Sequence, residues 1–342
     1  MSADEYPALL RDVLAKRDLS AEQMAATIGA IMDETLSPVR AAALLAALAA
    51  KGETVEEVVG AARAMRERSV RVEHDFPMVL DIVGTGGDGQ RTINISTAAA
   101  FVVAGCGVPV AKHGNRAASS ACGSADVLEA LGVPIDRAPE ASGRALRRHG
   151  IAFLFAQRHH PAMRAVGPVR RELGVRTVFN VLGPLTNPAG ATRQMVGVAR
   201  PEHLELMAHA LRALGGEAAA VIHGADGLDE VSGSAPTEVV QFDRGGFRRW
   251  TLEPARYGVR APLDAIRGGD ARANARTLSA ILDGERSARS DVVMLNAALA
   301  LVVAGEAVDL DDGMARARTS IETGRARAAL DALRGERETE LV

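Results

Sequence analysis

The chain has 342 residues, of which 47% are hydrophobic and 24% are charged, as is typical of a folded globular protein and not of a disordered one. A formal net charge of −3 gives no overall basic surface for nucleic acid or an anionic membrane. The two cysteines, Cys106 and Cys122, favour a reducing compartment over a disulfide framework. The N-terminal segment lacks the features of a signal peptide, and no apolar run reaches the roughly 18 residues needed to span a bilayer. We therefore expect a soluble, cytoplasmic protein of about two domains that binds neither nucleic acid nor membrane.

Residues 1 to about 70 are predicted to be entirely helical. Ser20 with Gln23, and Thr54 with Glu57, have the spacing of capping boxes at two helix N-termini. The stretch RAAALLAALAA carries an apolar stripe at helical spacing. Its alanine content allows helices to pack closely, which would serve either the core of one chain or a contact between two subunits of a dimer.

From Met78 onwards, short apolar runs of the β type alternate with helical patterns, and the C-terminal part returns to helices. The runs are MVLDIV, VPVA, IAFLFA, QMVGV and AAAVI. Continuous apolar strands that alternate with helices predict a mainly parallel sheet covered by helices on both faces. The expected fold class is therefore α/β, with a small all-helical domain before the larger sheet domain.

Three polar segments, GTGGDG, KHGNR and HGADGLDE, each follow a predicted strand directly. In parallel sheets the ligand crevice lies beyond the carboxyl ends of the strands. We therefore expect the three segments to meet at one edge of the sheet.

The glycine-rich segment from Gly84 to Gly89 has neither the Walker spacing nor the dinucleotide-binding spacing, and by itself it equally fits a plain strand-to-helix turn. Its continuation strengthens an anion-binding interpretation, because hydroxyl and amide side chains gather at the start of the next predicted helix, where free N–H groups attract anions. These side chains are Thr92, Asn94, Ser96 and Thr97. The alternative is that Ser96 or Thr97 is only a helix N-cap.

The segment KHGNRAASSACGS from Lys112 to Ser124 gives the stronger signal. Lys112, His113 and Arg116 concentrate positive charge after a strand, and Gly114 allows a tight turn. A solvated charged loop would not need so many small neutral donors between its cations, so we favour phosphate binding. The neutral donors are Asn115, Ser119, Ser120 and Ser124.

Two further segments supply charge. Asp229 and Glu230 are adjacent carboxylates of the kind that bind Mg²⁺ together with substrate phosphate oxygens, although two acidic residues also fit a surface turn. Arg170 and Arg171 either lie on an exposed helix face or supply one guanidinium that holds a substrate carboxylate.

Seven segments occur in order at the separations of a known family: GTGGD, NIST, KHGNRAASS-x-x-GSADVLEALG, RRELGVRTVFNVLGPLTNP, HGADGLDE, GGDARANA and LNAA. Over nearly its whole length the sequence resembles the anthranilate phosphoribosyltransferases. The resemblance implies transfer of a phosphoribosyl group from phosphoribosyl pyrophosphate to anthranilate with Mg²⁺, in a homodimer formed through helical parts. It also implies a discontinuous small helical domain (residues 1–74 plus about 168–192) and a larger α/β domain (residues 75–167 plus 193–342).

The resemblance also implies roles for single residues. Donor contacts are implied for Gly84, Gly87, Asp88, Thr92, Asn94, Ile95, Ser96, Thr97, Lys112, His113, Gly114, Asn115, Arg116, Ala117, Ala118, Ser119, Ser120 and Ser124. Gly84, Asn115 and Arg170 would contact anthranilate, and His113 and His160 would line its channel. Ser96 would bind one magnesium ion, and Asp229 with Glu230 a second. No residue is assigned as a catalytic acid or base. Cys122 departs from the family pattern, in which a small residue such as serine is expected.

Two alternatives stay open at this point. A pyrimidine-nucleoside phosphorylase would share the fold and a similar loop, but the HGNR run, the Asp229–Glu230 pair and the lack of a further C-terminal domain argue against it. A non-catalytic relative that binds nucleic acid would lack the acceptor arginine and would show salt-dependent DNA binding, whereas this chain has Arg170 and a slightly negative charge.

Overall fold

Helices alone make up the first part of the chain in the computed structural model, which describes residues 5–117 and 121–335. Ser20 and Thr54 form the predicted capping boxes with Gln23 and Glu57. Ser37 caps the third helix, which carries a proline in its first turn. The helices are α1 (Glu5–Leu14), α2 (Ala21–Met32), α3 (Pro38–Lys51) and α4 (Val55–Glu67).

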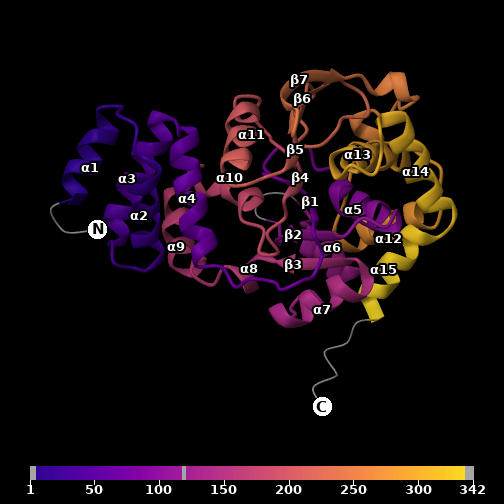
Figure 1. The fold of residues 1–342 in the computed structure, drawn as a ribbon, viewed down its shortest axis with the longest axis horizontal. Coiled ribbons are helices and arrows are strands. Elements are labelled where there is room, and N and C mark those ends of the chain that lie inside the picture. The colour runs from indigo at the N-terminus through magenta and orange to yellow at the C-terminus, as the bar shows by residue number, and fades with distance from the viewer. Residues whose placement is uncertain (1–4, 118–120, 336–342) are drawn as a thin grey trace, which may run out of the picture.

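A seven-stranded sheet with the order β3-β2-β1-β4-β5-β6-β7 forms the centre of the second part (Figure 1). Strands β1 to β5 run parallel, as predicted, and β6 and β7 add an antiparallel hairpin at one edge that the sequence pattern did not reveal. The strand order reverses at β1, which pairs with both β2 and β4, and ligands of such sheets bind at this switch point. The strands are β1 (Leu80–Gly84), β2 (Val110–Gly114), β3 (Ile151–Phe155), β4 (Arg193–Gly197), β5 (Ala218–Gly224), β6 (Thr237–Asp243) and β7 (Gly246–Leu252).

Helices cover both faces of the sheet, which confirms the expected α/β class (Figure 1). One face packs mainly on α5 and α13 and the other on α11, through cores built largely from Ala, Val, Leu and Ile. The remaining helices are α5 (Ile95–Gly105), α6 (Ser124–Ala130), α7 (Pro139–His149), α8 (Ala156–His159), α9 (Met163–Leu173), α10 (Phe179–Leu182), α11 (His203–Ala213), α12 (Ala271–Leu282), α13 (Ala288–Ala304), α14 (Leu310–Glu322) and α15 (Arg325–Gly335), with 3-10 turns η1 (Gly183–Leu185), η2 (Pro254–Tyr257) and η3 (Leu263–Ile266). Within the described residues, no helix combines the length and hydropathy needed to cross a membrane.

The segment that contains α9 and α10 packs with the N-terminal helices despite its distance in sequence. Val166 and Val169 of α9, together with Phe179 of α10, belong to the same buried cluster as Leu44 and Leu45 of α3. Helix α9 contacts both α2 and α3 (Figure 1). The same cluster continues into α11 and strands β4 to β6, and the discontinuous small domain stays a prediction.

Helices α2 and α4 approach so closely that their contact requires a glycine. A Cβ atom at Gly60 of α4 would overlap the carbonyl oxygen and carbon of Ala21 in α2. The overlapping atoms are backbone atoms of a helix, so no side-chain rotation could relieve the contact.

We expect Gly60→Ala to lower the free energy of unfolding by about 2–3 kcal/mol, because the added methyl group would push two packed helices apart. Gly335→Ala is the control, since Gly335 lies in the last turn of α15 and a Cβ there would meet no atom of the described residues within 4 Å. Alanine there should leave stability unchanged or raise it by up to about 1 kcal/mol. Urea denaturation of both variants measures the effect, and equal midpoints would contradict the packing argument.

Candidate active site

The carboxyl ends of β1 and β2 and the turn after β5 enclose one cleft of about 410 Å³, as predicted for the three polar segments. Most of the residues expected to bind ligands line it: Gly84, Gly87, Asp88, Thr92, Asn94, Ser96, Thr97, Lys112, His113, Gly114, Asn115, Arg116, Ala117, Ser124, Arg170, Asp229 and Glu230. Ile95 is instead buried in the core beneath the cleft. His160 lines a neighbouring pocket. Ala118, Ser119 and Ser120 lie outside the described residues.

The turn that carries Asp229 lies directly against the ends of two strands. The Oδ2 atom of Asp229 accepts a hydrogen bond of 2.8 Å from the N–H of Gly86. A Cβ at Gly84 would come within 2.5 Å of this oxygen, and a Cβ at Gly197 would overlap the main chain of Asp229. Glycines at the ends of β1 and β4 therefore allow the acidic turn to reach the glycine-rich loop.

The start of α5 already contacts a carboxyl group of this chain. The Oε1 atom of Glu230 accepts a hydrogen bond of 3.2 Å from the N–H of Ser96. Asn94 is the N-cap residue of α5, so Ser96 and Thr97 are helical residues and the N-cap alternative for them is wrong. The helix N-terminus thus stabilises the negative charge of Glu230 beside the cleft.

Burial and neighbouring carboxylates raise the pKa values of both members of the acidic pair. Burial, reinforced by Asp88, raises the pKa of Asp229 to about 7. Burial and the charge of Asp229 raise the pKa of Glu230 to about 8, while Lys112 opposes this shift. Two neighbouring carboxylates that resist ionisation together fit a divalent cation, which would stabilise both in the charged form.

The donor set also fits magnesium and not zinc. Among residues 5–117 and 121–335, no group of three or more His, Cys, Asp or Glu side chains is placed to hold a metal ion. Mg²⁺ is typically bound by one or two carboxylates together with substrate phosphates and water. Asp229 and Glu230 can supply those carboxylates.

Lys112 is almost fully buried beside the acidic pair, and its Nζ donates to the carbonyl of Ile82 at 2.6 Å. Burial lowers the pKa of Lys112, and the nearby Asp81 and Glu230 oppose this effect. Asp81 in turn accepts hydrogen bonds from the N–H of His113 and from Nδ2 of Asn187, at 3.1 and 2.8 Å. Asp81 was not predicted as a functional residue, although a charged residue inside the apolar run MVLDIV signals a buried partner.

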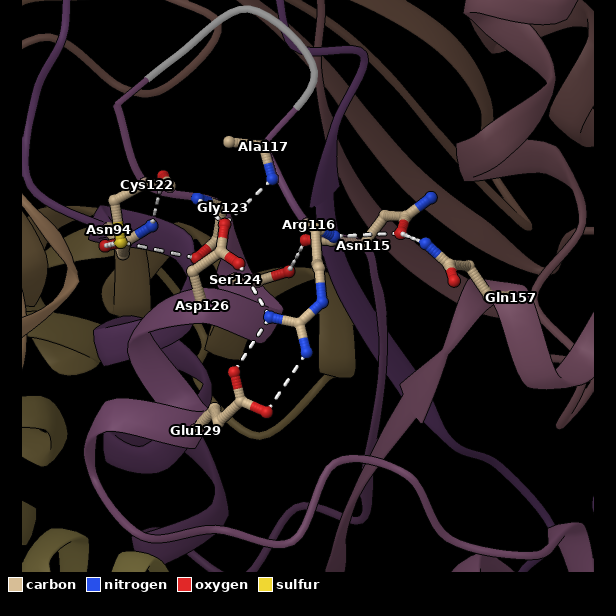
Figure 2. A network of polar contacts seen from close by, with 10 residues as sticks. All are labelled: Asn94, Asn115, Arg116, Ala117, Cys122, Gly123, Ser124, Asp126, Glu129 and Gln157. Carbon is tan, nitrogen blue, oxygen red and sulfur yellow. Dashed lines mark hydrogen bonds and ion pairs between the residues drawn. The ribbon is translucent and has the colours of Figure 1, made fainter. Parts of the chain in front are cut away.

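The loop after β2 is held by α6, as Figure 2 shows. Asp126 accepts hydrogen bonds from the N–H groups of Ala117 and Gly123, both at 2.9 Å. The Arg116 guanidinium forms ion pairs with Asp126 and Glu129, at 3.0 and 2.8 Å. Arg116 was predicted as a phosphate-binding cation, but in this structure its charge is shared with two carboxylates that position the loop.

Cys122, where the family resemblance led us to expect a residue such as serine, lies at the cleft wall beside Asn94. Its carbonyl accepts a hydrogen bond of 3.1 Å from Nδ2 of Asn94, and its Sγ lies 3.5 Å from Oδ1 of Asn94 (Figure 2). Burial raises the pKa of the thiol to about 11, so Cys122 stays protonated. The substitution leaves the side chain as a neutral packing group.

The opposite wall of the cleft presents a partly buried guanidinium and neutral imidazoles. Arg170, in the last turn of α9, lines the cleft with its guanidinium carbon 5.9 Å from the centre of the Phe179 ring, whereas Arg171 is exposed. The rings of His113 and His160 lie 5.1 Å apart. Burial lowers the pKa of His113 well below its ordinary value and that of His160 to about 4, so both are neutral near pH 7.

Comparisons with known proteins agree with this arrangement. The glycosyl transferase family a/b domain matches residues 77–327, and the helical bundle domain of the same family matches residues 7–69. The anthranilate phosphoribosyltransferase of Thermomicrobium roseum is 53% identical over 330 residues, covering 95% of this chain and 94% of the relative. The chain belongs to the anthranilate phosphoribosyltransferase family.

Solved structures of this family superpose closely on the chain. The enzyme from Thermus thermophilus has a TM-score of 0.91 and 45% identity, and the alignment covers 96% of this chain and 98% of that one. The anthranilate phosphoribosyltransferase of Saccharomyces cerevisiae, solved in complex with PRPP and Mg, has a TM-score of 0.90 and 28% identity, covering 98% of each chain. The yeast enzyme has also been solved with 4-fluoroanthranilate.

Four polar residues line the cleft without having been assigned from the sequence: Thr85, Arg91, Arg176 and Asn180. Arg176 and Asn180 lie in the segment RRELGVRTVFNVLG, where only the first two arginines were considered. Asn180 accepts a hydrogen bond of 3.0 Å from the N–H of Thr177, which orders the turn that carries Arg176.

Proposed function

We propose that this chain transfers the 5-phosphoribosyl group of phosphoribosyl pyrophosphate to the amine of anthranilate, releasing pyrophosphate, as a step of tryptophan biosynthesis. The observation that carries the proposal is the single cleft, which gathers the glycine-rich loop, the Lys112 loop, the acidic pair and Arg170. Family membership over nearly the whole chain supports this activity over nucleoside phosphorolysis or nucleic-acid binding.

The reaction needs Mg²⁺, and the proposed ligands are Ser96 for one ion and Asp229 with Glu230 for a second. When bound, magnesium neutralises charge on the diphosphate of the donor. The donor contacts and metal ligands implied by the family resemblance are retained here as proposals, supported by their common location in the cleft.

Charge stabilisation and positioning account for catalysis without an acid or base. The anomeric carbon of the donor is expected to lose pyrophosphate through an oxocarbenium-like state, in which negative charge develops on the leaving group. Lys112 and the amides of the glycine-rich loop would stabilise that charge. Arg170 would hold the carboxylate of anthranilate and so aim its amine, which is unprotonated near pH 7 and needs no base. The neutral imidazoles of His113 and His160 suit the channel of an uncharged aromatic ring.

The proposed function is tested by following anthranilate consumption through its fluorescence, with and without phosphoribosyl pyrophosphate and Mg²⁺. We expect consumption only when both are present. Phosphorolysis of a pyrimidine nucleoside, or salt-dependent DNA binding without transferase activity, would instead support one of the two alternatives and refute this function.

We predict that Arg170→Ala raises the KM for anthranilate more than about tenfold, because it removes a charged partner of the acceptor carboxylate. Arg171→Ala is the matched control, since Arg171 is the exposed neighbour on the same helix. Initial rates at varied anthranilate concentration measure the effect. An unchanged KM in Arg170→Ala would remove this residue from acceptor binding.

We predict that the double variant Asp229→Asn with Glu230→Gln shifts the Mg²⁺ concentration needed for half-maximal rate to higher values, because two anionic ligands become neutral. Asp243→Asn serves as the control, because Asp243 is an exposed acidic residue of the β6–β7 turn. A magnesium titration identical to that of the unsubstituted chain would refute the second metal site.

We propose a homodimer that forms through the helical parts. Val39 of α3 is 79% exposed and Leu14 of α1 is 66% exposed, so this region presents large apolar side chains to solvent. Light scattering should give about twice the chain mass of 35.7 kDa. Val39→Asp should shift the mass towards the monomer, whereas Val308→Asp, at an 88% exposed position elsewhere, should not. A monomeric unsubstituted chain would refute the proposal.

We also propose that the protein acts in the cytoplasm. Cys106 and Cys122 form no disulfide in the described part of the chain, which suits a reducing compartment.

A further inference from the structure

Arg176 is a guanidinium in the cleft that forms no ion pair with the residues that the structure describes. It lies in the turn between α9 and α10, and its Nη1 is 3.4 Å from the carbonyl oxygen of Gly86. Its Nη2 is buried and has no hydrogen-bond partner within residues 5–117 and 121–335.

The surroundings of Arg176 disfavour its positive charge in the folded chain. Burial lowers the pKa of Arg176, and the neighbouring Arg200 acts in the same direction against a weaker opposing effect of Asp229. Arg176 also lowers the pKa of Arg170, which is itself partly buried. A desolvated charge without a partner destabilises a protein, so an unsatisfied group in a cleft requires an explanation.

Two other arginines show how the protein itself can satisfy a guanidinium, one partly buried and one exposed. Arg66 is partly buried and donates to the carbonyl oxygens of Leu185 and Leu214, at 2.6 and 3.1 Å. Arg116 is paired with Asp126 and Glu129. Arg176 differs from both in that its Nη2 is buried in the cleft and has no hydrogen-bond partner among the described residues.

The position of Arg176 indicates which anion it binds. A Cβ at Gly87 would overlap Nη1 of Arg176, so the guanidinium lies directly against the glycine-rich loop. The adjacent Gly86 contacts Arg176 through its carbonyl and Asp229 through its N–H. The guanidinium therefore lies close to the loop and the carboxylate that are proposed to bind the diphosphate and its magnesium.

We infer that Arg176 binds the diphosphate of the phosphoribosyl donor and stabilises the pyrophosphate as it leaves. This inference rests on the proposed transferase function and adds a second guanidinium to it, distinct from the acceptor-binding Arg170. A planar guanidinium can donate two parallel hydrogen bonds to phosphate oxygens. Its positive charge is in place before the reaction, at the loop where negative charge develops on the leaving group.

The test compares Arg176→Gln and Arg176→Lys with the matched control Arg171→Gln, which removes an exposed arginine five positions earlier. Three quantities are measured: inhibition by inorganic pyrophosphate, the kinetic constants for each substrate, and the thermal unfolding midpoint without ligand. Calorimetric binding of pyrophosphate with Mg²⁺ provides a readout that needs no turnover.

We expect Arg176→Gln to weaken pyrophosphate binding and to lower kcat/KM for the donor by about tenfold or more each, because a charge-assisted contact is lost. The KM for anthranilate should stay within about twofold, and Arg176→Lys should fall between the unsubstituted chain and Arg176→Gln. The unfolding midpoint should stay equal or rise, because the fold gains nothing from the unpaired charge.

Three results would overturn the inference. Unchanged pyrophosphate binding and donor kinetics would exclude any contact with the diphosphate. A raised KM for anthranilate alone would assign the guanidinium to the acceptor carboxylate. A lowered unfolding midpoint, together with equal losses of kcat/KM for both substrates, would show a structural role. An inactive unsubstituted chain would refute the transferase function itself, while calorimetry would still decide whether Arg176 binds pyrophosphate.

Discussion

At the ends of β1 and β4, the turn that carries Asp229 lies against two strand backbones that have no side chain at the point of contact. Gly84 and Gly197 leave the space that the carboxylate and the main chain of this turn occupy. The contact brings Asp229 to the N–H of Gly86 and brings the next residue, Glu230, to the start of α5. The proposed metal-binding carboxylates and the glycine-rich loop therefore depend on one close backbone approach.

Among the described residues, some charged groups of the cleft have a partner of opposite charge and others do not. Lys112 and Asp81 balance each other's charge beneath it, and Arg116 is paired at its rim. By contrast, Asp229 resists ionisation beside its acidic neighbours, and within the same residues Nη2 of Arg176 has no hydrogen-bond partner. A donor that brings phosphate oxygens together with magnesium would complete both sets of charges at once. This is a physical reason why the site can bind a polyanion in a chain whose net charge is negative.

Local sequence patterns predicted the elements of the fold well. The capping boxes at Ser20 and Thr54 formed because each involves residues only three positions apart. The alternation of apolar runs with helices predicted the parallel strands, and the rule for parallel sheets then placed three polar segments at one edge. The β6–β7 hairpin was missed, since its outer strand β7 is mostly exposed and shows no continuous apolar run. The number of subunits and the domain limits stay predictions.

The amino-acid sequence by itself determined which residue types gather at the cleft, because each motif begins at the carboxyl end of a parallel strand. Only the tertiary structure decided what each side chain does there. Arg171 is exposed, whereas Arg170 lines the cleft. Arg116 forms ion pairs with the carboxylates of α6, and Glu230 lies at the N-terminus of α5. Nη2 of Arg176 has no hydrogen-bond partner among the described residues. The contacts that set the acidic turn and Arg176 join residues 90 or more positions apart. No local periodicity encodes such pairings, since they arise only when the sheet brings distant loops to one edge.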